Sequence, residues 1–321
     1  MILIIDFGSQ FNQLIARRVR ECHVYCQIES PRIAIKDIRS MKPEGIILSG
    51  GPSSIYEKNS PRIDTDIFNL NIPVLGICYG MQFMVDALGG VVKSTRKREY
   101  GFAELSIKKK TGLFKSMDTK TQTWMSHGDS IHKLPPGFVT TATTRNTPIA
   151  AAQNYRKRLY GLQFHPEVEH TPKGKLMIRH FLFDVCGCRR SWTMKSFATS
   201  SMTEIREQIG NQKVILGLSG GVDSSVTALL IHKAVGKNLT CIFVDNGLLR
   251  KNEASQLKQR LKQHLNINIK FVSAKSKFLN ALARVSDPEK KRKIIGRVFM
   301  EVFESEAKKI KGAEFLAQGT L

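Results

Sequence analysis

The sequence predicts an α/β protein with two domains, and three observations point to this class. The chain has 321 residues, which is room for two domains of roughly 150 residues each. Short apolar runs bounded by Gly, Pro and Ser alternate with stretches of helical periodicity, as in open, mostly parallel sheets. The alternation breaks off in a short, polar, non-periodic segment and then starts again. We therefore expect domains at 1–188 and 201–321, joined by a linker at 189–200.

The first domain is predicted to be a mostly parallel sheet with an antiparallel appendage. Its buried parallel strands are expected at Ile2–Ile5, Gly45–Leu48 and Val74–Ile77, where the residues are almost all apolar. From Val91 to Leu162 the pattern changes to short strands separated by turn residues, with no long helix between them. These short strands would form the appendage. A helix at 173–185 is predicted to close the domain.

The second domain repeats the alternation and is predicted to be an incomplete α/β domain. The expected elements are, in order, a strand at Val214–Leu218, a helix at Ser224–Val235, a strand at Leu239–Val244, a helix at Asn252–His264, a strand at Ile267–Val272 and a helical stretch up to Lys311. The last residues, Phe315–Leu321, have the pattern of a strand that runs into a loop. We therefore expect the chain to stop within the domain.

The composition of the chain indicates the cellular compartment of the protein and excludes some kinds of binding partner. No segment has the roughly 20 consecutive apolar residues of a membrane span, so no membrane partner is expected. The apolar run at the N-terminus is too short for a secretory signal. Six cysteines are scattered along the chain, which favours reduced thiols and a cytoplasmic location. Zinc binding by Cys22, His23 and Cys26, or by Cys186 and Cys188, is disfavoured because neither group has a second half with ligand spacing.

The net charge of +23 is the extreme value in the composition. Clustered Lys and Arg side chains would indicate nucleic-acid binding, because they displace counterions from phosphates. The excess is spread, however, with a net +10 in residues 1–188 and +13 in residues 189–321. The densest basic run, Lys290–Lys293, has no interleaved aromatic residues on which bases could stack. We therefore expect no nucleic-acid partner.

A cysteine lies between a predicted strand and a predicted helix. The segment Pro73-Val-Leu-Gly-Ile-Cys78-Tyr-Gly-Met-Gln82 places glycines two residues before and two residues after Cys78. This G-x-C-x-G pattern is the thiol form of a nucleophile elbow, in which a sharp turn presents one side chain at the carboxyl end of a strand. A helix N-terminus there favours the thiolate, which is the attacking form. A buried cysteine in an ordinary tight turn is the alternative.

The segment Gly161-Leu-Gln-Phe-His165-Pro-Glu167 supplies the partners that a cysteine nucleophile needs. His165 can take the thiol proton and later protonate a leaving group, while Glu167 can orient the imidazole. We therefore predict a Cys-His-Glu triad. Taken alone, His165 also fits a structural histidine. A zincin helix is excluded, because Pro166 prevents a regular helix and the H-E-x-x-H order is absent.

A third segment, Ser49-Gly-Gly-Pro-Ser53, follows a predicted strand and can bring backbone N–H groups close to a developing oxyanion. The S-G-G-P turn, the G-x-C-x-G elbow and the F-H-P-E segment together resemble class I glutamine amidotransferases. The resemblance implies that glutamine is hydrolysed to release ammonia and that the N–H groups of Gly51 and Tyr79 form the oxyanion hole. It also implies that glutamine is contacted by Ser53, Gln82, Ser126, His127 and Gly128.

The second predicted domain contains a glycine- and serine-rich loop between a strand and a helix. Its consecutive N–H groups at a helix N-terminus form an anion cradle, without the lysine of a Walker loop or the spacing of a dinucleotide fold. The motif S-G-G-x-D-S-S resembles the pyrophosphate loop of N-type ATP pyrophosphatases, which have an adenine-nucleotide hydrolase-like fold. The resemblance implies that ATP is bound with Mg²⁺ near Asp223 and that the adenosine part lies near Val244. The loop residues are Ser219, Gly220, Gly221, Val222, Asp223, Ser224 and Ser225.

Segments from the whole chain resemble the glutamine-hydrolysing GMP synthase family. They are Asp6–Glu21, Trp124–Asp129, Val244–Arg250, Lys293–Arg297 and Phe315–Leu321. The resemblance implies that xanthosine monophosphate, ATP and glutamine give GMP, AMP, pyrophosphate and glutamate. Members of that family continue past the last segment to finish the ATP domain and add a C-terminal dimerisation domain. We therefore expect a homodimer for the full-length family rather than for this chain, and no GMP formation by this chain alone.

Other functions remain as alternatives. Amidotransferases of carbamoyl phosphate or CTP synthesis use ATP-binding folds that differ from the loop at Ser219, and a γ-glutamyl hydrolase would have the triad without a second domain. The chain could also act only as a glutaminase, or as a binding module without catalysis. Glutamate release from the isolated chain separates an enzyme from a binding module.

Overall fold

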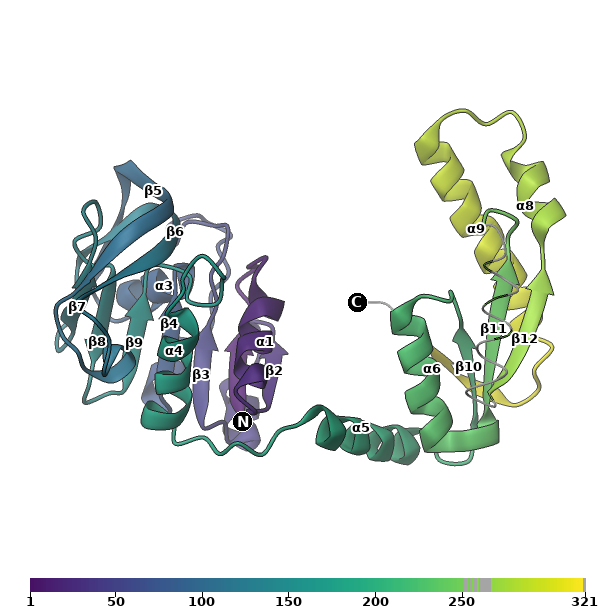
Figure 1. The fold of residues 1–321 in the computed structure, drawn as a ribbon, viewed down its shortest axis with the longest axis horizontal. Coiled ribbons are helices and arrows are strands. Elements are labelled where there is room, and N and C mark those ends of the chain that lie inside the picture. Colours follow the sequence, from purple (N-terminus) through teal and green to yellow (C-terminus); the bar gives the residue numbers. More distant parts are fainter. Residues whose placement is uncertain (251–252, 254–255, 257–258, 260–266, 320–321) are drawn as a thin grey trace. The chain divides into compact units, whose positions relative to one another are not determined.

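The computed structural model describes residues 1–250, 253, 256, 259 and 267–319, without the side chains of residues 95–97. The chain forms two compact units, Met1–Thr193 and Met194–Leu321 (Figure 1). Their boundary falls within the segment predicted to be a linker, 189–200. Residues from Met194 onward belong to helix α5 (Met194–Ile209), so the second part of that segment is helical.

The first unit is built on a nine-stranded sheet with the order β2-β1-β3-β4-β9-β8-β7-β5-β6. The first five strands in this order pair in parallel, and the rest continue the sheet in antiparallel pairs. The parallel sheet with an antiparallel appendage is therefore confirmed. The strands are β1 (Ile2–Ile5), β2 (Cys26–Glu29), β3 (Gly45–Leu48), β4 (Val74–Ile77), β5 (Val91–Ile107), β6 (Lys120–Lys133), β7 (Val139–Thr143), β8 (Ala151–Asn154) and β9 (Leu159–Leu162).

Two strands of the appendage are longer than the sequence predicts. β5 has 17 residues and β6 has 14, and the two pair along almost their whole lengths as an antiparallel ribbon. The exposed Tyr100 and Phe102 on β5 break the alternation that would reveal one long strand. The sequence pattern therefore predicts several short strands in place of the two long ones.

Helices cover both faces of the first sheet. Because side chains alternate along a strand, Ile2 and Ile4 of β1 pack with α1 and α4, whereas Leu3 and Ile5 pack with α2 and α3. The predicted closing helix at 173–185 begins as α4 and widens into a π-helical turn, η3. The helical elements are α1 (Asn12–Glu21), α2 (Ile35–Met41), η1 (Thr65–Asn69), α3 (Tyr79–Ala87), η2 (Gly112–Phe114), α4 (Gly174–Arg179) and η3 (His180–Val185).

The second unit has a four-stranded, fully parallel sheet with the order β12-β11-β10-β13. Helices α5 and α6 pack on one face and α8 and α9 on the other. The predicted helix at 252–264 lies outside the described residues, apart from three isolated positions. The elements after α5 are β10 (Lys213–Gly217), α6 (Val222–Val235), η4 (Gly236–Asn238), β11 (Leu239–Asp245), β12 (Asn268–Ser273), α8 (Lys275–Leu282), α9 (Pro288–Ala307) and β13 (Ala313–Ala317).

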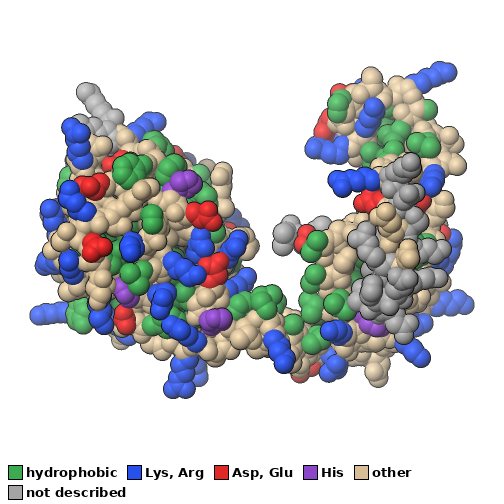
Figure 2. All heavy atoms as spheres, viewed as in Figure 1, with side chains coloured by type: hydrophobic (Ala, Val, Ile, Leu, Met, Phe, Trp, Pro, Cys, Tyr) green, Lys and Arg blue, Asp and Glu red, His purple; other side chains and the backbone are tan. Residues whose placement is uncertain are grey.

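The positively charged side chains are spread over the surface. Figure 2 shows Lys and Arg side chains distributed over the visible face of each unit rather than gathered in one stripe. Among the described residues, no helix is long and apolar enough to cross a membrane.

Candidate active site

Cys78 lies at the turn between strand β4 and helix α3. Its backbone adopts φ 50° and ψ −107°, a conformation that is strained for a residue with a side chain. Its N–H donates to the carbonyl of Leu162 on the neighbouring strand β9 at 2.7 Å. The flanking glycine Gly80 is required by packing, because a Cβ there would lie 2.3 Å from the carbonyl oxygen of Leu48. The sharp turn that the sequence predicts is therefore present, with the strain on the cysteine itself.

His165 and Glu167 follow β9, the strand that pairs in parallel with β4. The two ends of neighbouring parallel strands therefore bring Cys78 and His165 to the same edge of the sheet. The Nδ1 of His165 lies 2.7 Å from Oε1 of Glu167, and both residues are buried. Since a carboxylate only accepts hydrogen bonds, Nδ1 is the donor and is protonated.

The electrostatic surroundings favour a charged imidazole at His165. Burial by itself would lower the pKa of His165, but interactions with the side chains of Cys78 and Glu167 outweigh it and raise the pKa to about 10. The ring is therefore protonated at neutral pH, which is the state that pairs with a thiolate.

The backbone around the histidine is fixed by further hydrogen bonds. The hydroxyl of Thr171 donates to the carbonyl of His165 at 2.7 Å, and Nε of Arg18 donates to the carbonyl of Glu167 at 2.9 Å. The Phe11 ring meets the His165 ring edge to face, with 5.4 Å between centroids. Arg18, Phe11 and Thr171 do not belong to the motifs that identified the site, so the sequence did not predict their part in it.

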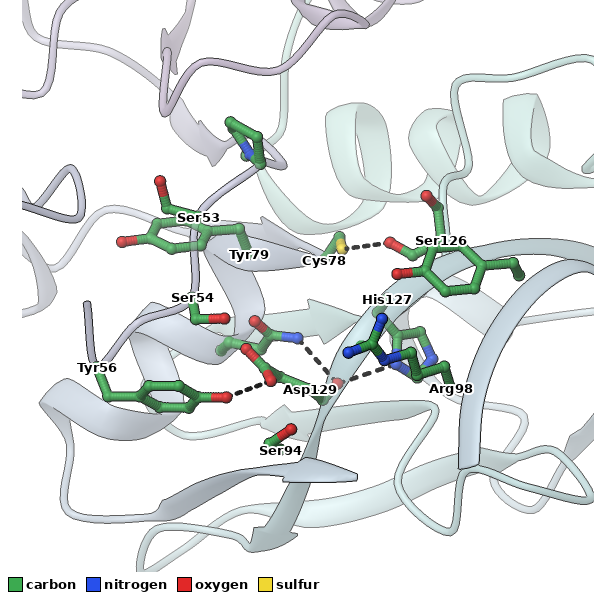
Figure 3. A pocket seen from close by; sticks show the side chains of 15 residues that line it. Ser53, Ser54, Tyr56, Cys78, Tyr79, Ser94, Arg98, Ser126, His127 and Asp129 are labelled. Carbon is green, nitrogen blue, oxygen red and sulfur yellow. Dashed lines mark hydrogen bonds between the residues drawn. The ribbon is translucent and has the colours of Figure 1, made fainter. Parts of the chain in front are cut away.

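A cavity of about 380 Å³ opens beside Cys78 (Figure 3). All eight residues that the sequence predicts for the oxyanion hole, glutamine binding and the nucleophile line it, whereas His165 and Glu167 are not among its lining residues. The predicted residues are Gly51, Ser53, Cys78, Tyr79, Gln82, Ser126, His127 and Gly128. Those that the sequence did not predict are Pro52, Ser54, Tyr56, Ser94, Arg98, Tyr100 and Asp129.

The unpredicted residues give the cavity its charges. Asp129 is buried and accepts a hydrogen bond from the Tyr56 hydroxyl, while Arg98 comes from the opposite strand β5 (Figure 3). Asp129 directly follows the predicted Ser126-His127-Gly128 segment and ends the segment Trp124–Asp129 that resembles the synthase family, and these two signals could have identified it. Arg98 and Tyr56 come from other parts of the chain, and nothing in their local sequence indicates a place in the cavity.

Two glutamines support the wall next to the thiol. The amide of Gln82 donates to the carbonyl of Asp129 at 3.2 Å and to Oε1 of Gln163 at 3.3 Å. The amide of Gln163 in turn lies 3.7 Å from Sγ of Cys78. Because both hydrogens of the Gln82 amide are taken by the protein, its oxygen is the atom left for a ligand.

The geometry near Cys78 also suits stabilisation of an oxyanion. Tyr79 is the first residue of α3, so its N–H has no acceptor within the helix. Gly51 lies close against Phe7, since a Cβ at Gly51 would stand 2.7 Å from the Phe7 carbonyl oxygen. A glycine at that position therefore lets the turn after β3 pack against Phe7 and Tyr79, and a Cβ at the preceding Gly50 would stand 3.8 Å from Cβ of Cys78.

The predicted phosphate loop of the second unit lies between β10 and α6. Residues 219–223 are exposed, and the loop is held by its own serines. Oγ of Ser219 lies 3.0 Å from Oγ of Ser224, and the Ser224 and Ser225 hydroxyls donate to the Gly221 carbonyl at 3.1 and 2.8 Å. Gly221 caps α6 without a side-chain hydrogen bond. The first-turn N–H groups of α6 therefore face solvent or a ligand.

The structure brings Val244 to the same sheet edge as this loop. Val244 is buried near the end of β11, which pairs in parallel with β10. Asp223 is exposed in the first turn of α6. A cavity of about 210 Å³ lies beside Ser219 and is bordered by Phe299 and Phe303 of α9. Within the described part of the chain, no group of three His, Cys, Asp or Glu side chains is placed to hold a metal ion.

Comparison with known proteins agrees with the geometry of the first unit. The sequence profile of the family described as class-I glutamine amidotransferase matches residues 3–185, more than half of the chain. The chain belongs to the class-I glutamine amidotransferase family. The crystal structure of a Thermoplasma acidophilum protein, described as one component of a GMP synthase, has a TM-score of 0.52 and 29% identity, covering 58% of this amidotransferase chain and 93% of that one.

The second unit of this amidotransferase matches another family. The profile described as NAD synthase covers residues 196–303, in agreement with the predicted ATP pyrophosphatase domain. Glutamine-hydrolysing GMP synthases of Clostridium botulinum and Brachyspira hyodysenteriae are each 53% identical to this chain over its whole length. The chain spans 63% and 62% of the length of these two relatives.

Proposed function

We propose that this chain hydrolyses glutamine at Cys78 and supplies the ammonia for the synthesis of GMP from xanthosine monophosphate. The observation that carries the proposal is the buried arrangement of Cys78 on its strained turn with His165 and Glu167 on the neighbouring strand end. The identity of 53% to glutamine-hydrolysing GMP synthases supports the nucleotide product.

The hydrolysis follows from the arrangement of the triad and from the protonated ring of His165. The Cys78 thiolate attacks the side-chain amide carbon of glutamine, and the amide oxygen becomes an oxyanion that the N–H groups of Gly51 and Tyr79 stabilise. His165 gives its proton to the nitrogen, so that ammonia leaves and a thioester remains. Water then attacks the thioester as His165 takes up its proton, and glutamate is released. Glu167 holds the imidazole in position through both steps.

Glutamine contacts are assigned to the cavity wall. Ser53, Gln82, Ser126, His127 and Gly128 are proposed to contact the substrate, and all five line the cavity. At His127 the contact would come from the backbone or from a ring edge, because Nδ1 of the ring is hydrogen-bonded to the carbonyl of Asp129.

The second unit is proposed to bind ATP. The first-turn N–H groups of α6 suit phosphate oxygens, and the exposed Asp223 of the same turn would hold Mg²⁺ together with them. The resemblance assigns Val244 to the adenosine part. Bound Mg²⁺ neutralises phosphate charge, which a loop without lysine does not do by itself. Transfer of AMP from ATP to xanthosine monophosphate, with release of pyrophosphate, creates the leaving group that ammonia displaces.

Labelling with an electrophilic glutamine analogue tests the proposal. We expect the analogue to modify Cys78 alone among the six cysteines, as shown by peptide mapping. Burial raises the pKa of Cys22, Cys26 and Cys186, and raises that of Cys241 to about 12, so these thiols are poor nucleophiles. Modification of Cys22 or Cys241 with Cys78 untouched would contradict the proposal, and a chain that binds the analogue without reacting would be a binding module.

A further inference from the structure

A buried carboxylate lies behind the cavity wall and takes no part in the reaction described above. Glu99 of β5 is 7% exposed, and it pairs across the ribbon with His127 of β6, which is 4% exposed. Burial of a carboxylate is costly unless hydrogen bonds compensate for the lost water. The contacts of Glu99 therefore indicate what it holds in place.

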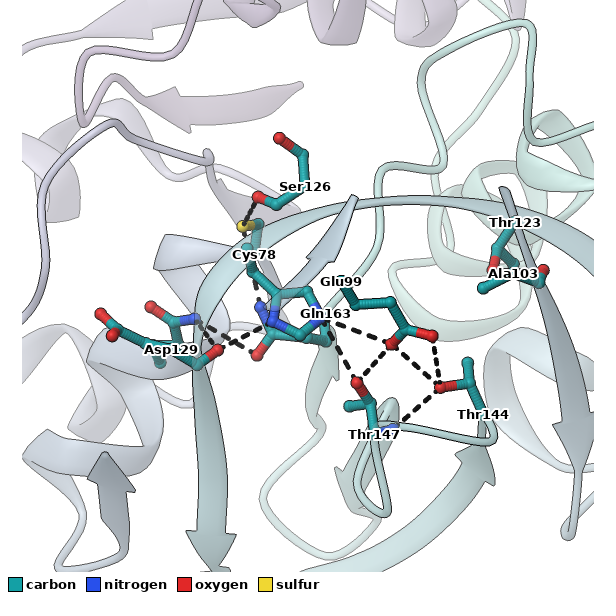
Figure 4. A network of polar contacts seen from close by, with 11 residues as sticks. Cys78, Glu99, Ala103, Thr123, Ser126, Asp129, Thr144, Thr147 and Gln163 are labelled. Carbon is teal, nitrogen blue, oxygen red and sulfur yellow. Dashed lines mark hydrogen bonds and ion pairs between the residues drawn. The ribbon is translucent and has the colours of Figure 1, made fainter. Parts of the chain in front are cut away.

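Glu99 accepts hydrogen bonds from two threonines of one loop (Figure 4). The Thr144 hydroxyl donates to both carboxylate oxygens at 3.0 Å, and the Thr147 hydroxyl donates to Oε2 at 2.5 Å. The N–H of Thr147 also donates to Oγ1 of Thr144 at 3.0 Å. The carboxylate thus fastens the loop after β7 to the ribbon.

The network continues from this loop to the cavity wall. Nε2 of His127 lies 3.4 Å from the Thr147 oxygen and 3.8 Å from Oε2 of Glu99, and Nδ1 lies 2.9 Å from the carbonyl oxygen of Asp129. A carbonyl only accepts, so Nδ1 donates. The same Asp129 carbonyl accepts from the Gln82 amide at 3.2 Å. A continuous set of polar contacts therefore joins Glu99 to residues that line the cavity.

Glu99 also lies where the ribbon loses its regular register. Ser94 pairs with Asp129 and Glu99 pairs with His127, so four residues of β5 stand opposite Gly128 alone. This bulge carries Arg98, which lines the cavity. Glu99 is the first residue to pair again after the bulge, so its hydrogen bonds fix the place at which the bulge ends.

We propose that Glu99 and Thr147 are positioning residues, which hold the wall at 126–129 and the β5 bulge in the geometry that accepts glutamine. The inference rests on the proposed hydrolysis of glutamine at Cys78. Neither residue lines the cavity or touches the thiol, and the triad itself is carried by β4 and β9. Loss of the network should therefore weaken recognition of glutamine and leave the reactivity of the thiol unchanged.

Two reagents separate recognition from reactivity in the full chain. The electrophilic glutamine analogue must fit the wall, whereas iodoacetamide needs only an accessible thiolate. In Glu99→Ala and in Thr147→Val, we expect labelling of Cys78 by the analogue to slow by about tenfold, which corresponds to the loss of one buried hydrogen bond. Labelling by iodoacetamide should proceed at the wild-type rate.

Conservative variants provide a rescue. In Glu99→Gln, the new amide can donate to the Thr147 oxygen, which frees the Thr147 hydroxyl to donate to Nε2 of His127, so the loop stays joined to His127. Thr147→Ser keeps the hydroxyl. Both should react with the analogue at close to the wild-type rate. Glu104→Ala is the matched control, because Glu104 is an exposed acid on the same strand whose ion pair with Lys120 lies at the surface.

The outcomes are distinct. Slower labelling by both reagents in Glu99→Ala and Thr147→Val would mean a general loss of structure and would overturn the inference, as would equal rates in all variants. Failure of Glu99→Gln and Thr147→Ser to recover would overturn the hydrogen-bonded network as the cause. A wild-type chain that reacts with iodoacetamide at Cys78 but never with the analogue would refute the proposed function, and the inference with it.

Discussion

The sites of the two units differ in how they are assembled. In the first unit, Gly51, Cys78 and His165 follow the ends of β3, β4 and β9, and Ser126 lies within β6, so four separate elements supply the site. In the second unit, the phosphate loop is one continuous segment, and its serines hydrogen-bond within that segment. A covalent reaction needs several groups in fixed relation, whereas phosphate recognition by backbone N–H groups is local. The first site should therefore respond sharply to single substitutions and the second mildly.

Removal of the nucleophile should give the largest effect. Cys78→Ala should lower glutamine hydrolysis by about 10⁶-fold, as for other triad nucleophiles, and leave ATP binding by the second unit unchanged. Glutamate release and calorimetric titration with ATP measure the two activities. Hydrolysis above about a thousandth of the wild-type rate would contradict the role of Cys78.

A pair of glycine substitutions compares the packing of the two units. Gly80→Ala should lower the free energy of unfolding of the first unit by about 1–3 kcal/mol, because the new Cβ would stand 2.3 Å from the Leu48 carbonyl. Gly296→Ala, at an exposed helical position of α9 with no atom near the new Cβ, should raise that of the second unit by about 0.5–1 kcal/mol. Denaturant titration of each variant gives both values, and destabilisation by Gly296→Ala would show that α9 has a contact that this structure lacks.

The pH profile of hydrolysis tests the His165 assignment. The pKa of His165 is raised to about 10, so the ring keeps its proton up to that pH and loses it above. We expect the rate to fall about tenfold per pH unit above pH 10, since the leaving ammonia then lacks its proton donor. The interaction also stabilises the fold fully below pH 6.5, and this contribution is lost as the pH rises through 10. A rate that falls already between pH 7 and 8 would place the proton donor elsewhere.

The smallest effect is expected at the phosphate loop. Asp223→Asn should weaken binding of ATP by roughly fivefold in the presence of Mg²⁺, because a single exposed charge contributes up to about 1 kcal/mol. Binding without Mg²⁺ should not weaken. Glu314→Gln serves as the control, since Glu314 is exposed near the start of β13. Loss of all binding in Asp223→Asn would show that this site, too, depends on one residue.

Much of the fold was predictable because buried parallel strands are continuous apolar segments. Ile2–Ile5, Gly45–Leu48 and Val74–Ile77 have the predicted bounds, since both faces of these strands are covered by helices. The β5–β6 ribbon was harder to predict from the sequence. Its polar and exposed positions give no continuous apolar signal, and its bulge shifts the alternation between Ser94 and Glu99.

In the candidate site, the motif residues were predictable and their supports were not. Cys78, His165 and Glu167 stand in short patterns whose chemistry requires those residue types. Glu99 and Thr147 are separated by 48 residues and meet only through strand pairing. His127 lies within a predicted segment, but Nδ1 of its ring is hydrogen-bonded to the carbonyl of Asp129 on the same strand. A sequence pattern does not reveal this contact.

The adjacency of β4 and β9 has a consequence for how specificity can change. After β4 and α3 the chain leaves the parallel sheet, and it returns beside β4 at Leu159, so β5 to β8 are an excursion from one point of the sheet. The reactive groups stay with the two strands, while the excursion supplies the far wall with Arg98 and Asp129. Replacement of this excursion by a segment of another length or sequence would change which amide substrate is accepted. The chemistry of the thiol would stay the same. The topology thus separates the part of the molecule that can be varied from the part that must be kept.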